Sequence, residues 1–424
     1  MIKQLLTIGF VLATLSGYSQ DESNIQQSDS IINASYNDVY LKSIEQQEQF
    51  ESYVAQSETT NSASYQRKLR RDSIRANKKI WATVLGGPSY TPEASFGVGG
   101  ALLASFRLDN SDSVSFRSFL PIGFNISING TRVVAGAGTL FFKENRFRIY
   151  STYGYRNEPA HYYGKGIESI ESNYRSDSTT LFHKQTFQFN PRFVWSVRNN
   201  FYLGALIDLN YTKGDDFNEV MLNDEYFNLF EQKYFNSGIG GIIQYDTRDD
   251  VATPFKGVYL SAMAKIYGKY LGGDYNYQLL DLEYRQFVPL MERTTLAVVA
   301  RSQIGFNDVP YTELPSFGSP FDLRGYYLGQ YRDKSMGYAI AEYRQMIGSM
   351  EAYEQGRFYS KLGYVLWAGV GTLGDTPAEW TKYKYNYGVG FRIQIQPRKN
   401  FRIDVGKAHG QEGVQFYLNM TEAF

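Results

Sequence analysis

The sequence of 424 residues predicts an all-β protein, a transmembrane antiparallel β-barrel. The main observation is that apolar and polar side chains alternate in most segments from residue 80 onward, as in strands with one apolar face. The composition agrees, because 39 Gly and 36 Tyr with a mean hydropathy of −0.39 suit strands that face lipid on one side and water on the other. No apolar run of about 20 residues, which a membrane-spanning helix requires, follows the N-terminus.

Charge and composition exclude several classes of function. The 43 Lys and Arg residues balance the 43 Asp and Glu residues, whereas a nucleic-acid-binding protein needs a basic excess. The absence of Cys excludes a disulfide framework and a thiol nucleophile. The three His residues are isolated, and no phosphate-binding loop or Gly-x-Ser-x-Gly motif appears. We therefore predict no nucleic-acid partner, no metal, no cofactor and no enzymatic activity.

Two N-terminal segments precede the alternating region. In residues 1–20, Lys3 comes before a short apolar core at residues 5–15, which predicts a signal peptide, since this core is too short for a membrane anchor. Residues 21–79 are polar, first acidic and then basic, and predict a charged periplasmic linker. The basic run at residues 67–79 would form a solvated helix before the first strand, the preferred interpretation, or bind anionic lipid headgroups or a partner.

The barrel domain covers residues 80–424. Its clearest strand is residues 387–396, where Tyr387, Val389 and Phe391 alternate with Gly and Arg. Alternation alone does not distinguish a soluble sandwich from a membrane barrel, but strand length does. Segments of about 10 residues match tilted membrane-crossing strands, whereas strands in globular proteins average about five to six.

The alternating pattern divides this domain into sixteen segments, an even number as in single-chain bacterial barrels. The segments are residues 81–90, 96–107, 112–127, 131–143, 146–156, 180–197, 201–213, 236–248, 257–268, 275–290, 294–306, 336–347, 357–373, 384–396, 400–408 and 413–420. Between the third and the fourth, Asn129-Gly130 predicts a two-residue hairpin turn with positive φ at both residues.

Strand parity assigns the connections to two sides. If the charged linker is periplasmic, every second connection lies on the periplasmic side and is short, and residues 143–146 and 397–400 agree with this. Residues 307–335 then form an extracellular loop. Because this loop is longer than an ordinary hairpin connection, it indicates a functional role or a plug.

The same loop carries a resemblance to a known family. Residues 314–347 resemble the long inward-folding loop and following strand of the BamA/TamA-type outer-membrane assembly and translocation superfamily, the bacterial surface antigen barrels. The Arg-Gly-aromatic tip of that family appears as Arg324-Gly325-Tyr326, and its Glu-aromatic-Arg strand begins at Glu342. The family's turn signature is matched by Asp246, Arg248, Asp249 and Gly257.

The resemblance implies that the loop inserts into the lumen and is locked there. Arg324 would pair with Glu342, because a desolvated guanidinium without a carboxylate is costly, and Gly325 would allow a tight backbone at the tip. The alternative is a surface loop whose arginine meets solvent. Many relatives carry an aromatic-x-Asp-x-Gly strand, which is here the stretch Trp367, Ala368, Gly369, Val370, Gly371, with Gly369 in place of the Asp. Arg324 would then depend more on Glu342, or on Asp322 or Asp375.

The last strand resembles the assembly signal of outer-membrane barrels, which implies that the protein is itself a client of the outer-membrane assembly machinery. The signal residues are Gln411, Gly413, Phe416, Leu418 and Phe424. The family also implies a weak seam between the first and last strands, where Gly86, Gly87 and Pro88 would weaken the ladder. Alternatively, these three residues only bend a corner of the barrel.

These features predict a protein of the bacterial outer membrane that contacts outer-membrane lipid. By resemblance, it would assist insertion of outer-membrane proteins or translocate polypeptides through a lateral seam or the lumen, with unfolded outer-membrane or secreted polypeptides as substrates. Residues 21–79 are too short and irregular for the periplasmic polypeptide-transport-associated modules of such factors, which favours an accessory barrel or one served by a separate partner. A plugged channel or pore, and a structural subunit of an outer-membrane complex, are the alternatives.

Overall fold

The computed structural model describes residues 80–91, 95–109, 115, 118–173, 175–176, 179–251, 253–354, 357–396, 399–420 and 422–424. The chain divides into two compact units, Met1–Lys78 and Lys79–Phe424, and every element described below belongs to the second. The predicted signal peptide, residues 1–20, and the predicted linker, residues 21–79, lie outside the described residues.

Sixteen strands form the main sheet, and each overlaps one of the sixteen segments predicted from alternation. They are β1 (Ile80–Thr91), β2 (Ser95–Phe106), β3 (Ser118–Ser127), β4 (Arg132–Phe141), β5 (Phe147–His161), β6 (Leu181–Arg198), β7 (Phe201–Asp215), β8 (Lys233–Asp246), β9 (Gly257–Tyr267), β10 (Tyr277–Met291), β11 (Thr294–Phe306), β14 (Ser335–Met346), β15 (Leu362–Gly374), β16 (Lys384–Gln396), β17 (Lys399–Ala408) and β18 (Gln415–Met420). A separate hairpin consists of β12 (Ser316–Phe317) and β13 (Tyr331–Arg332).

Short helices lie in the connections between strands. They are α4 (Ile167–Ser172), α5 (Glu219–Asn223) and α6 (Met350–Glu354), with 3-10 turns η2 (Lys143–Asn145), η3 (Phe227–Leu229), η4 (Lys269–Leu271), η5 (Phe358–Lys361) and η6 (Pro377–Glu379). None of the helices in the described residues is long and apolar enough to span a bilayer.

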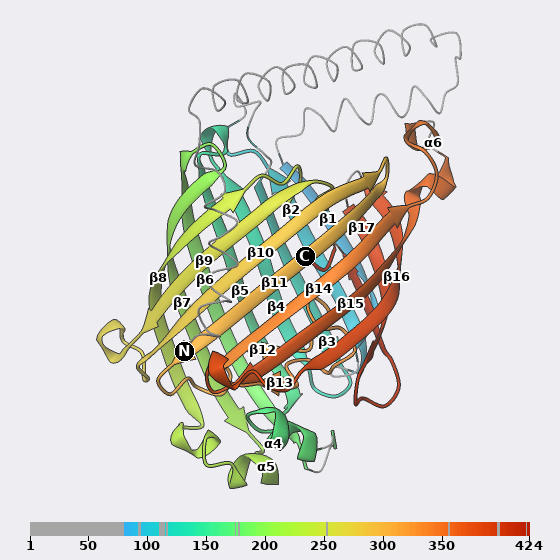
Figure 1. Ribbon diagram of the computed structural model, residues 1–424. Coiled ribbons are helices and arrows are strands. Elements are labelled where there is room, and N and C mark those ends of the chain that lie inside the picture. The colour runs from blue at the N-terminus through green and yellow to red at the C-terminus, as the bar shows by residue number, and fades with distance from the viewer. Residues whose placement is uncertain are drawn as a thin grey trace, which may run out of the picture. The chain divides into compact units, whose positions relative to one another are not determined.

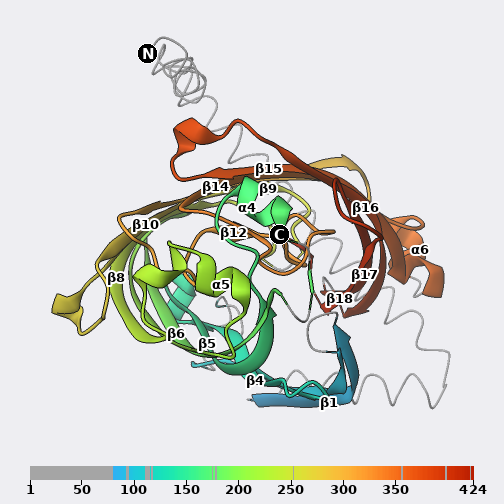
Figure 2. The same ribbon diagram turned by 90° about the horizontal axis from the view of Figure 1, so that it is seen from below.

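The strands of the main sheet pair antiparallel in chain order, and β11 pairs with β14 because the β12–β13 hairpin lies apart. The sheet curls so that its edge strands, β1 and β18, come to the same side of a barrel (Figures 1 and 2). Within the described residues, ladder pairing ends at these two strands. The β1–β2 register continues through Gly86, Gly87 and Pro88, so these residues do not interrupt the ladder on that side. The predicted fold class is confirmed.

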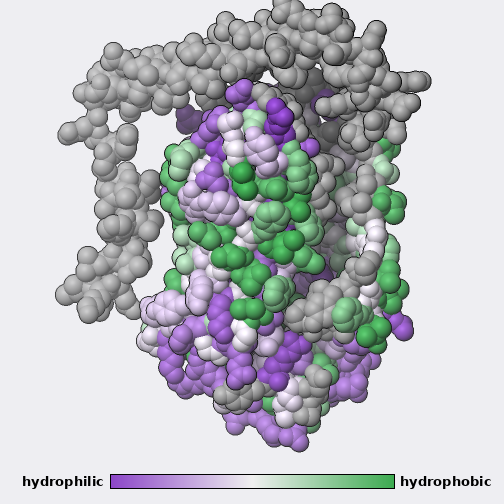
Figure 3. Space-filling model, turned by 90° about the vertical axis from the view of Figure 1, so that its right-hand side faces the viewer, coloured by the Kyte–Doolittle hydropathy of each residue, from purple (hydrophilic) through white to green (hydrophobic). Residues whose placement is uncertain are grey.

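Alternate residues of a strand face the outside and the inside of the barrel. In β16, Tyr387 and Val389 are 62% and 56% exposed, whereas Asn386 and Arg392 are 2% and 1% exposed. Figure 3 shows hydrophobic side chains across the middle of the wall and hydrophilic side chains gathered toward one end. An apolar outer belt with a polar inner face is the arrangement expected of a barrel in lipid.

The connections differ between the two ends of the barrel. We call the end that carries α4, α5 and the β12–β13 hairpin the loop end, and the opposite end the turn end (Figure 1). Contrary to the expectation of short connections at the turn end, residues 347–361 between β14 and β15 contain α6 and η5. Arg293 stabilises this long connection by donating to the carbonyl oxygens of Ile347 at 2.7 Å and Ser360 at 2.6 Å.

The turn between β3 and β4 also differs from its prediction. Gly130 has a φ of 90°, but Asn129 is not among the residues with positive φ. Instead, the Asn129 side-chain oxygen accepts hydrogen bonds from the backbone nitrogen of Thr131 at 3.3 Å and from its hydroxyl at 2.9 Å. The prediction of a two-residue turn was therefore wrong, because the hydrogen bonds of the Asn129 side chain stabilise a longer connection.

Apolar side chains fill much of the barrel interior. One cluster joins Phe317, Leu323 and Tyr326 of the β11–β14 connection to Ile340 and Trp367 of the wall. A second cluster, toward the loop end, is largely aromatic, with rings in edge-to-face contact such as Phe227 and Tyr311 at 5.0 Å between centroids. The connection between β11 and β14 is thus packed inside the barrel.

Candidate functional site

The connection between β11 and β14, residues 307–334, folds back into the barrel, and we call it the lumen loop (Figure 2). Near its tip, Asp322 closes a turn by accepting hydrogen bonds from the backbone nitrogen of Gly318 at 2.9 Å and the hydroxyl of Ser319 at 2.7 Å. Burial raises the pKa of Asp322, although both donors favour its charged form. This turn presents Arg324 to the inner face of the wall.

Arg324 is held by two carboxylates and an aromatic ring. Its guanidinium is hydrogen-bonded to Glu342 on β14 and, at 2.6 Å, to Asp404 on β17. All three side chains have an exposed fraction of 0%. The guanidinium carbon lies 3.7 Å from the centroid of the Trp367 ring on β15. Because a buried guanidinium requires such partners, these contacts fix the position of the loop tip.

Backbone groups of the tip bind the same wall. Asn386 on β16 donates a side-chain hydrogen bond to the carbonyl oxygen of Arg324 at 2.7 Å, and the backbone nitrogen of Gly325 donates to the hydroxyl of Tyr417 on β18 at 2.8 Å. Gly325 has a φ of 113°, and a Cβ there would lie 2.8 Å from backbone atoms of β17. The hydroxyl of Tyr326 donates to a carbonyl oxygen of β16 at 3.0 Å. The tip therefore contacts strands up to the edge of the sheet.

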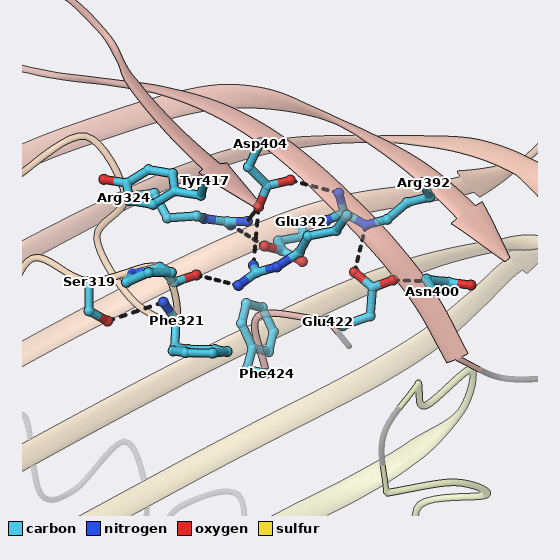
Figure 4. Close-up of polar contacts among 12 residues, drawn as sticks. Ser319, Phe321, Arg324, Glu342, Arg392, Asn400, Asp404, Tyr417, Glu422 and Phe424 are labelled. Atoms are coloured by element: carbon cyan, nitrogen blue, oxygen red, sulfur yellow. Dashed lines mark hydrogen bonds and ion pairs between the residues drawn. The ribbon is translucent and has the colours of Figure 1, made fainter. Parts of the chain in front are cut away.

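Asp404 joins three guanidinium groups (Figure 4). Besides the loop arginine, it accepts hydrogen bonds from Arg392 at 2.6 Å and Arg402 at 3.1 Å. Arg402 also donates to the carbonyl oxygen of Pro320 in the lumen loop at 2.7 Å. One carboxylate thus connects the loop to two neighbouring strands.

The inner face leaves no room for an acidic side chain at Gly369. A Cβ at Gly369 would lie 2.9 Å from the side chain of Leu323, and a Cβ at Gly371 would also collide with Leu323. Gly390 on β16 lies opposite Asp404 and leaves room for its carboxylate. The tip of the lumen loop therefore occupies the space over β15, and the second acid stands on β17.

We expect Gly369→Asp, which would restore the acid of many relatives, to destabilise the barrel. A Cβ at this position would lie 2.5 Å from the side-chain oxygen of Asn386 and 2.9 Å from Leu323, so the new side chain would overpack a filled site. The free energy of unfolding, measured by urea titration in detergent, should fall by about 1–3 kcal/mol. Adding Leu323→Ala should recover part of this loss, whereas a more stable single variant would contradict the packing argument.

The carboxylates of the two alternative partners, Asp322 and Asp375, do not bond to the guanidinium of Arg324 in the described structure, and Asp322 contacts this arginine only through its backbone, with its carbonyl oxygen accepting from the Arg324 nitrogen at 2.8 Å. Asp322 bonds within the loop, and Asp375, between β15 and β16, pairs with Lys165 at 2.6 Å and Lys334 at 2.8 Å. Lys165 also contacts Asp333 at 3.1 Å. Burial lowers the pKa of Lys165, but the bonds to Asp375 and Asp333 outweigh burial and leave this pKa raised. This group ties the β5–β6 connection to the base of the lumen loop.

Sequence reasoning missed Asp404, Asn386 and Tyr417. Asp404 carried a usable signal, because Arg402 and Asp404 alternate with apolar residues in β17, and parity alone places both on the inner face. Their link to the loop tip had no such signal, since Asp404 is 80 positions from Arg324 in the chain. The contact follows only from the curvature that brings β17 near β14.

The residues of the turn signature lie at the turn end, between β8 and β9. Arg248 donates two hydrogen bonds to Asp246, at 2.9 Å and 3.0 Å. Asp249 accepts from two backbone nitrogens across the turn, at 2.9 Å and 3.1 Å, and Gly257 has a φ of 111°. These contacts shape the connection, and the structure does not bring these residues to the loop tip.

The residues of the predicted assembly signal lie in three environments. Phe416 and Leu418 are in β18 and face outward, each 63% exposed. Gln411 and Gly413 lie in the turn before β18, which begins at Gln415 and not at residue 413. Phe424 does not continue the outward series, because the chain turns inward after β18 and buries this ring at 7% exposure.

The chemistry available at the tip is ionic. Arg324, Glu342, Asp404 and Arg402 are all 0% exposed, so their charges satisfy one another and not an external ligand. Among the described residues, no group of three or more His, Asp or Glu side chains is placed to hold a metal ion. The arrangement is suited to holding the lumen loop against the wall.

A model of the Omp85 superfamily domain matches residues 98–424. The chain belongs to the Omp85 superfamily. The matched region runs from β2 to the end of the chain, so it includes the lumen loop and its partners on β14 to β18. The family recognised from Arg324, Gly325, Tyr326 and Glu342 is therefore confirmed. No curated protein matches the sequence.

Many solved structures share the fold of this Omp85 barrel, and three of them are BamA and two CdiB proteins. BamA from Haemophilus ducreyi lacking POTRA domains 1-3 matches with a TM-score of 0.53 and 12% identity, over 80% of this chain and 69% of that one. CdiB from Acinetobacter baumannii matches with a TM-score of 0.51 and 11% identity, over 81% of this chain and 60% of its own. CdiB from Escherichia coli matches with a TM-score of 0.50 and 10% identity, over 81% of this chain and 63% of its own. This chain thus spans less than two thirds of either CdiB chain.

Proposed function

We propose that this Omp85 barrel assists insertion of outer-membrane proteins or translocates polypeptides, through a seam between β1 and β18 or through the lumen. The observation that carries the proposal is that pairing in the described residues ends at β1 and β18, on the same side of the barrel (Figure 2). Edge strands present backbone groups that bind a client strand by β-augmentation, with little demand on its side chains. Membership of the superfamily and the likeness to BamA and CdiB support this role.

The two edges are unequal. β1 has 12 residues and pairs with β2 along all of them, whereas β18 has six residues and pairs with β17 along six. Because fewer ladder hydrogen bonds hold β18, we propose that this strand is the one that moves when a client enters. Phe416 and Leu418, which face outward from β18, would also serve as the recognised part of the assembly signal when the protein is itself a client.

Photo-crosslinking in living cells tests the seam. A crosslinking amino acid at Val84 of β1, or at Phe416 of β18, should capture nascent barrel proteins or a secreted polypeptide, identified by mass spectrometry. The same amino acid at Ile243 of β8 and Leu260 of β9 is the control, since these residues are also exposed on the outer face but lie away from both edges. Seam positions that yield only crosslinks between β1 and β18 would contradict the proposal.

A plugged channel or pore is the second candidate, and the packed lumen loop favours it. Deleting residues 316–332 would remove the β12–β13 hairpin and the tip. If conduction is the function, single-channel conductance in planar bilayers should rise on deletion, and seam crosslinks to clients should be absent. A structural subunit of an outer-membrane complex would show neither result and would instead lose its partners when residues 21–79 are removed.

We also propose that residues 1–20 direct export and that residues 21–79 are periplasmic, which places the turn end in the periplasm. The chain has no Cys, so single cysteines report on sidedness without background. Tyr270→Cys at the loop end and Phe358→Cys at the turn end are suitable, because the native side chains are 69% and 71% exposed. A membrane-impermeant maleimide should label the first in intact cells and the second only after the outer membrane is permeabilised. The opposite pattern would invert the orientation.

A further inference from the structure

The end of the chain lies on the lumen wall beside the loop tip. β18 ends at Met420, and the residues that follow turn inward, so that Glu422, Ala423 and Phe424 are 5%, 6% and 7% exposed. Figure 4 shows Glu422 directed at Arg392, within the same group of side chains that holds the loop tip. The apolar pattern of β18 does not predict this arrangement.

The wall holds this terminal segment by polar and aromatic contacts. Glu422 accepts hydrogen bonds from Arg392 at 2.9 Å and from the side chain of Asn400 at 2.8 Å. The carbonyl oxygen of Phe424 accepts from Arg344 at 3.1 Å, and the Phe424 ring lies 4.8 Å from the same guanidinium carbon. Arg392 and Arg344 are themselves 2% and 9% exposed at their side chains, so both depend on protein partners.

These contacts close a ring of interactions that includes the loop tip. In order, the ring consists of Glu422, Arg392, Asp404, Arg324, Glu342, Arg344 and Phe424. With Arg402, the side chains of this group comprise four guanidiniums and three carboxylates. Without Glu422, the four guanidiniums would share two side-chain carboxylates, both of which hold Arg324. The terminal segment therefore contributes to the charge balance that keeps the loop arginine buried.

We propose that residues 422–424 are a latch that couples the edge strand β18 to the lumen loop. When β18 leaves β17, Glu422 separates from Arg392, and Arg392 then competes with Arg324 for Asp404. The excess positive charge makes burial of Arg324 less favourable, so the loop tip loosens as the edge strand opens. By linkage, release of the loop also weakens the hold on β18. This inference rests on the proposed seam and states what its opening does to the lumen loop.

Hydrogen–deuterium exchange of the full-length protein in lipid nanodiscs tests the coupling. Glu422→Gln removes the charge but keeps the shape, and we expect exchange to accelerate by at least about fivefold both in β18 and in residues 318–328, the lower end of typical coupling between sites. Exchange of the Gly325 backbone amide reports on both segments, because this amide lies in the loop tip and donates to the hydroxyl of Tyr417 on β18. Glu412→Gln is the matched control, because Glu412 is exposed in the turn just before β18, and it should change neither segment.

The reciprocal experiment uses Arg324→Lys, which should accelerate exchange in β18, and its effect should be less than additive with Glu422→Gln. Faster exchange in β18 with an unchanged loop tip would overturn the latch, and so would no change in either segment. If Glu422→Gln does not assemble, Asn400→Ala removes one bond to Glu422 and keeps the ion pair, so it should give the same pattern with a smaller amplitude. The crosslinking experiment at the seam distinguishes the latch from the proposed function. If client crosslinks form but exchange in β18 and in the loop tip does not change together, the latch alone is rejected. If no client crosslinks form but exchange in the two segments does change together, the proposed function alone is rejected.

Discussion

Replacing Arg324 by Ala should lower the free energy of unfolding by about 2–4 kcal/mol and release the lumen loop from the wall. The expected loss lies slightly below the usual cost of breaking a buried ion pair, about 3–5 kcal/mol, because Glu342 and Asp404 each keep another guanidinium. Among the described residues, the loop tip would keep no ion pair to the wall, and its remaining charged partner would be Arg402, which donates to the carbonyl oxygen of Pro320 at 2.7 Å. Urea titration in detergent measures the stability, and protease cleavage within residues 318–328 measures release of the loop.

Two variants make this result specific to the tip. Arg285→Ala on β10 also removes a lumen ion pair, to Glu283 at 2.6 Å, but these side chains are 24% and 15% exposed and do not hold the loop. We expect a smaller loss of stability and an intact loop in that variant. The stability of Arg324→Lys should lie between those of the wild type and Arg324→Ala, because an ammonium group retains the charge but cannot bond to two carboxylates at once as the guanidinium does. Unchanged protease resistance in Arg324→Ala would refute the lock.

The strands were predictable because lipid and water impose a period of two on every segment of the wall. In β16, for example, each exposed aromatic or aliphatic residue is followed by a small or polar one, and the structure buries the polar set. Strand ends were less predictable, since they depend on turn chemistry. The described part of the third strand begins at Ser118, and the predicted start at residue 112 lies outside the described residues. Asn129 bonds to Thr131 in place of adopting a positive φ. The long β14–β15 connection is held by Arg293, which sequence alone did not connect to it.

The residues of the candidate site likewise divide into those that the sequence could predict and those that it could not. Arg324 and Glu342 are 18 positions apart, on a loop and the strand that follows it, so a resemblance in one continuous segment was enough to join them. Asp404, Asn386 and Tyr417 come from later strands, and their contacts with the tip depend on how the sheet curls. Phe424 continues an outward apolar pattern in the sequence, but Glu422 meets Arg392 inside, and burying that ion pair takes the end of the chain into the lumen.

Asp404→Asn should cost more stability than Glu342→Gln, although the sequence singled out Glu342. Asp404 binds three guanidiniums, and its loss leaves the fully buried Arg402 with only the carbonyl oxygen of Pro320 among its hydrogen-bond partners in the described residues. An uncompensated buried charge costs about 3–5 kcal/mol. Glu342→Gln leaves Arg324 paired with Asp404 and leaves Arg344 at the carbonyl oxygen of Phe424, so we expect it to cost about 1 kcal/mol less.

A second substitution decides whether the charge of Arg402 is the cause. If the loss in Asp404→Asn comes from an unpaired guanidinium, adding Arg402→Leu should restore part of the stability, since removing both members of a buried pair often costs less than removing one. Arg402→Leu alone should be destabilising by a smaller amount, because Asp404 retains Arg392 and Arg324. A double variant less stable than Asp404→Asn would show that Arg402 holds the loop through Pro320 independently of Asp404. A greater loss in Glu342→Gln than in Asp404→Asn would return the central role to Glu342.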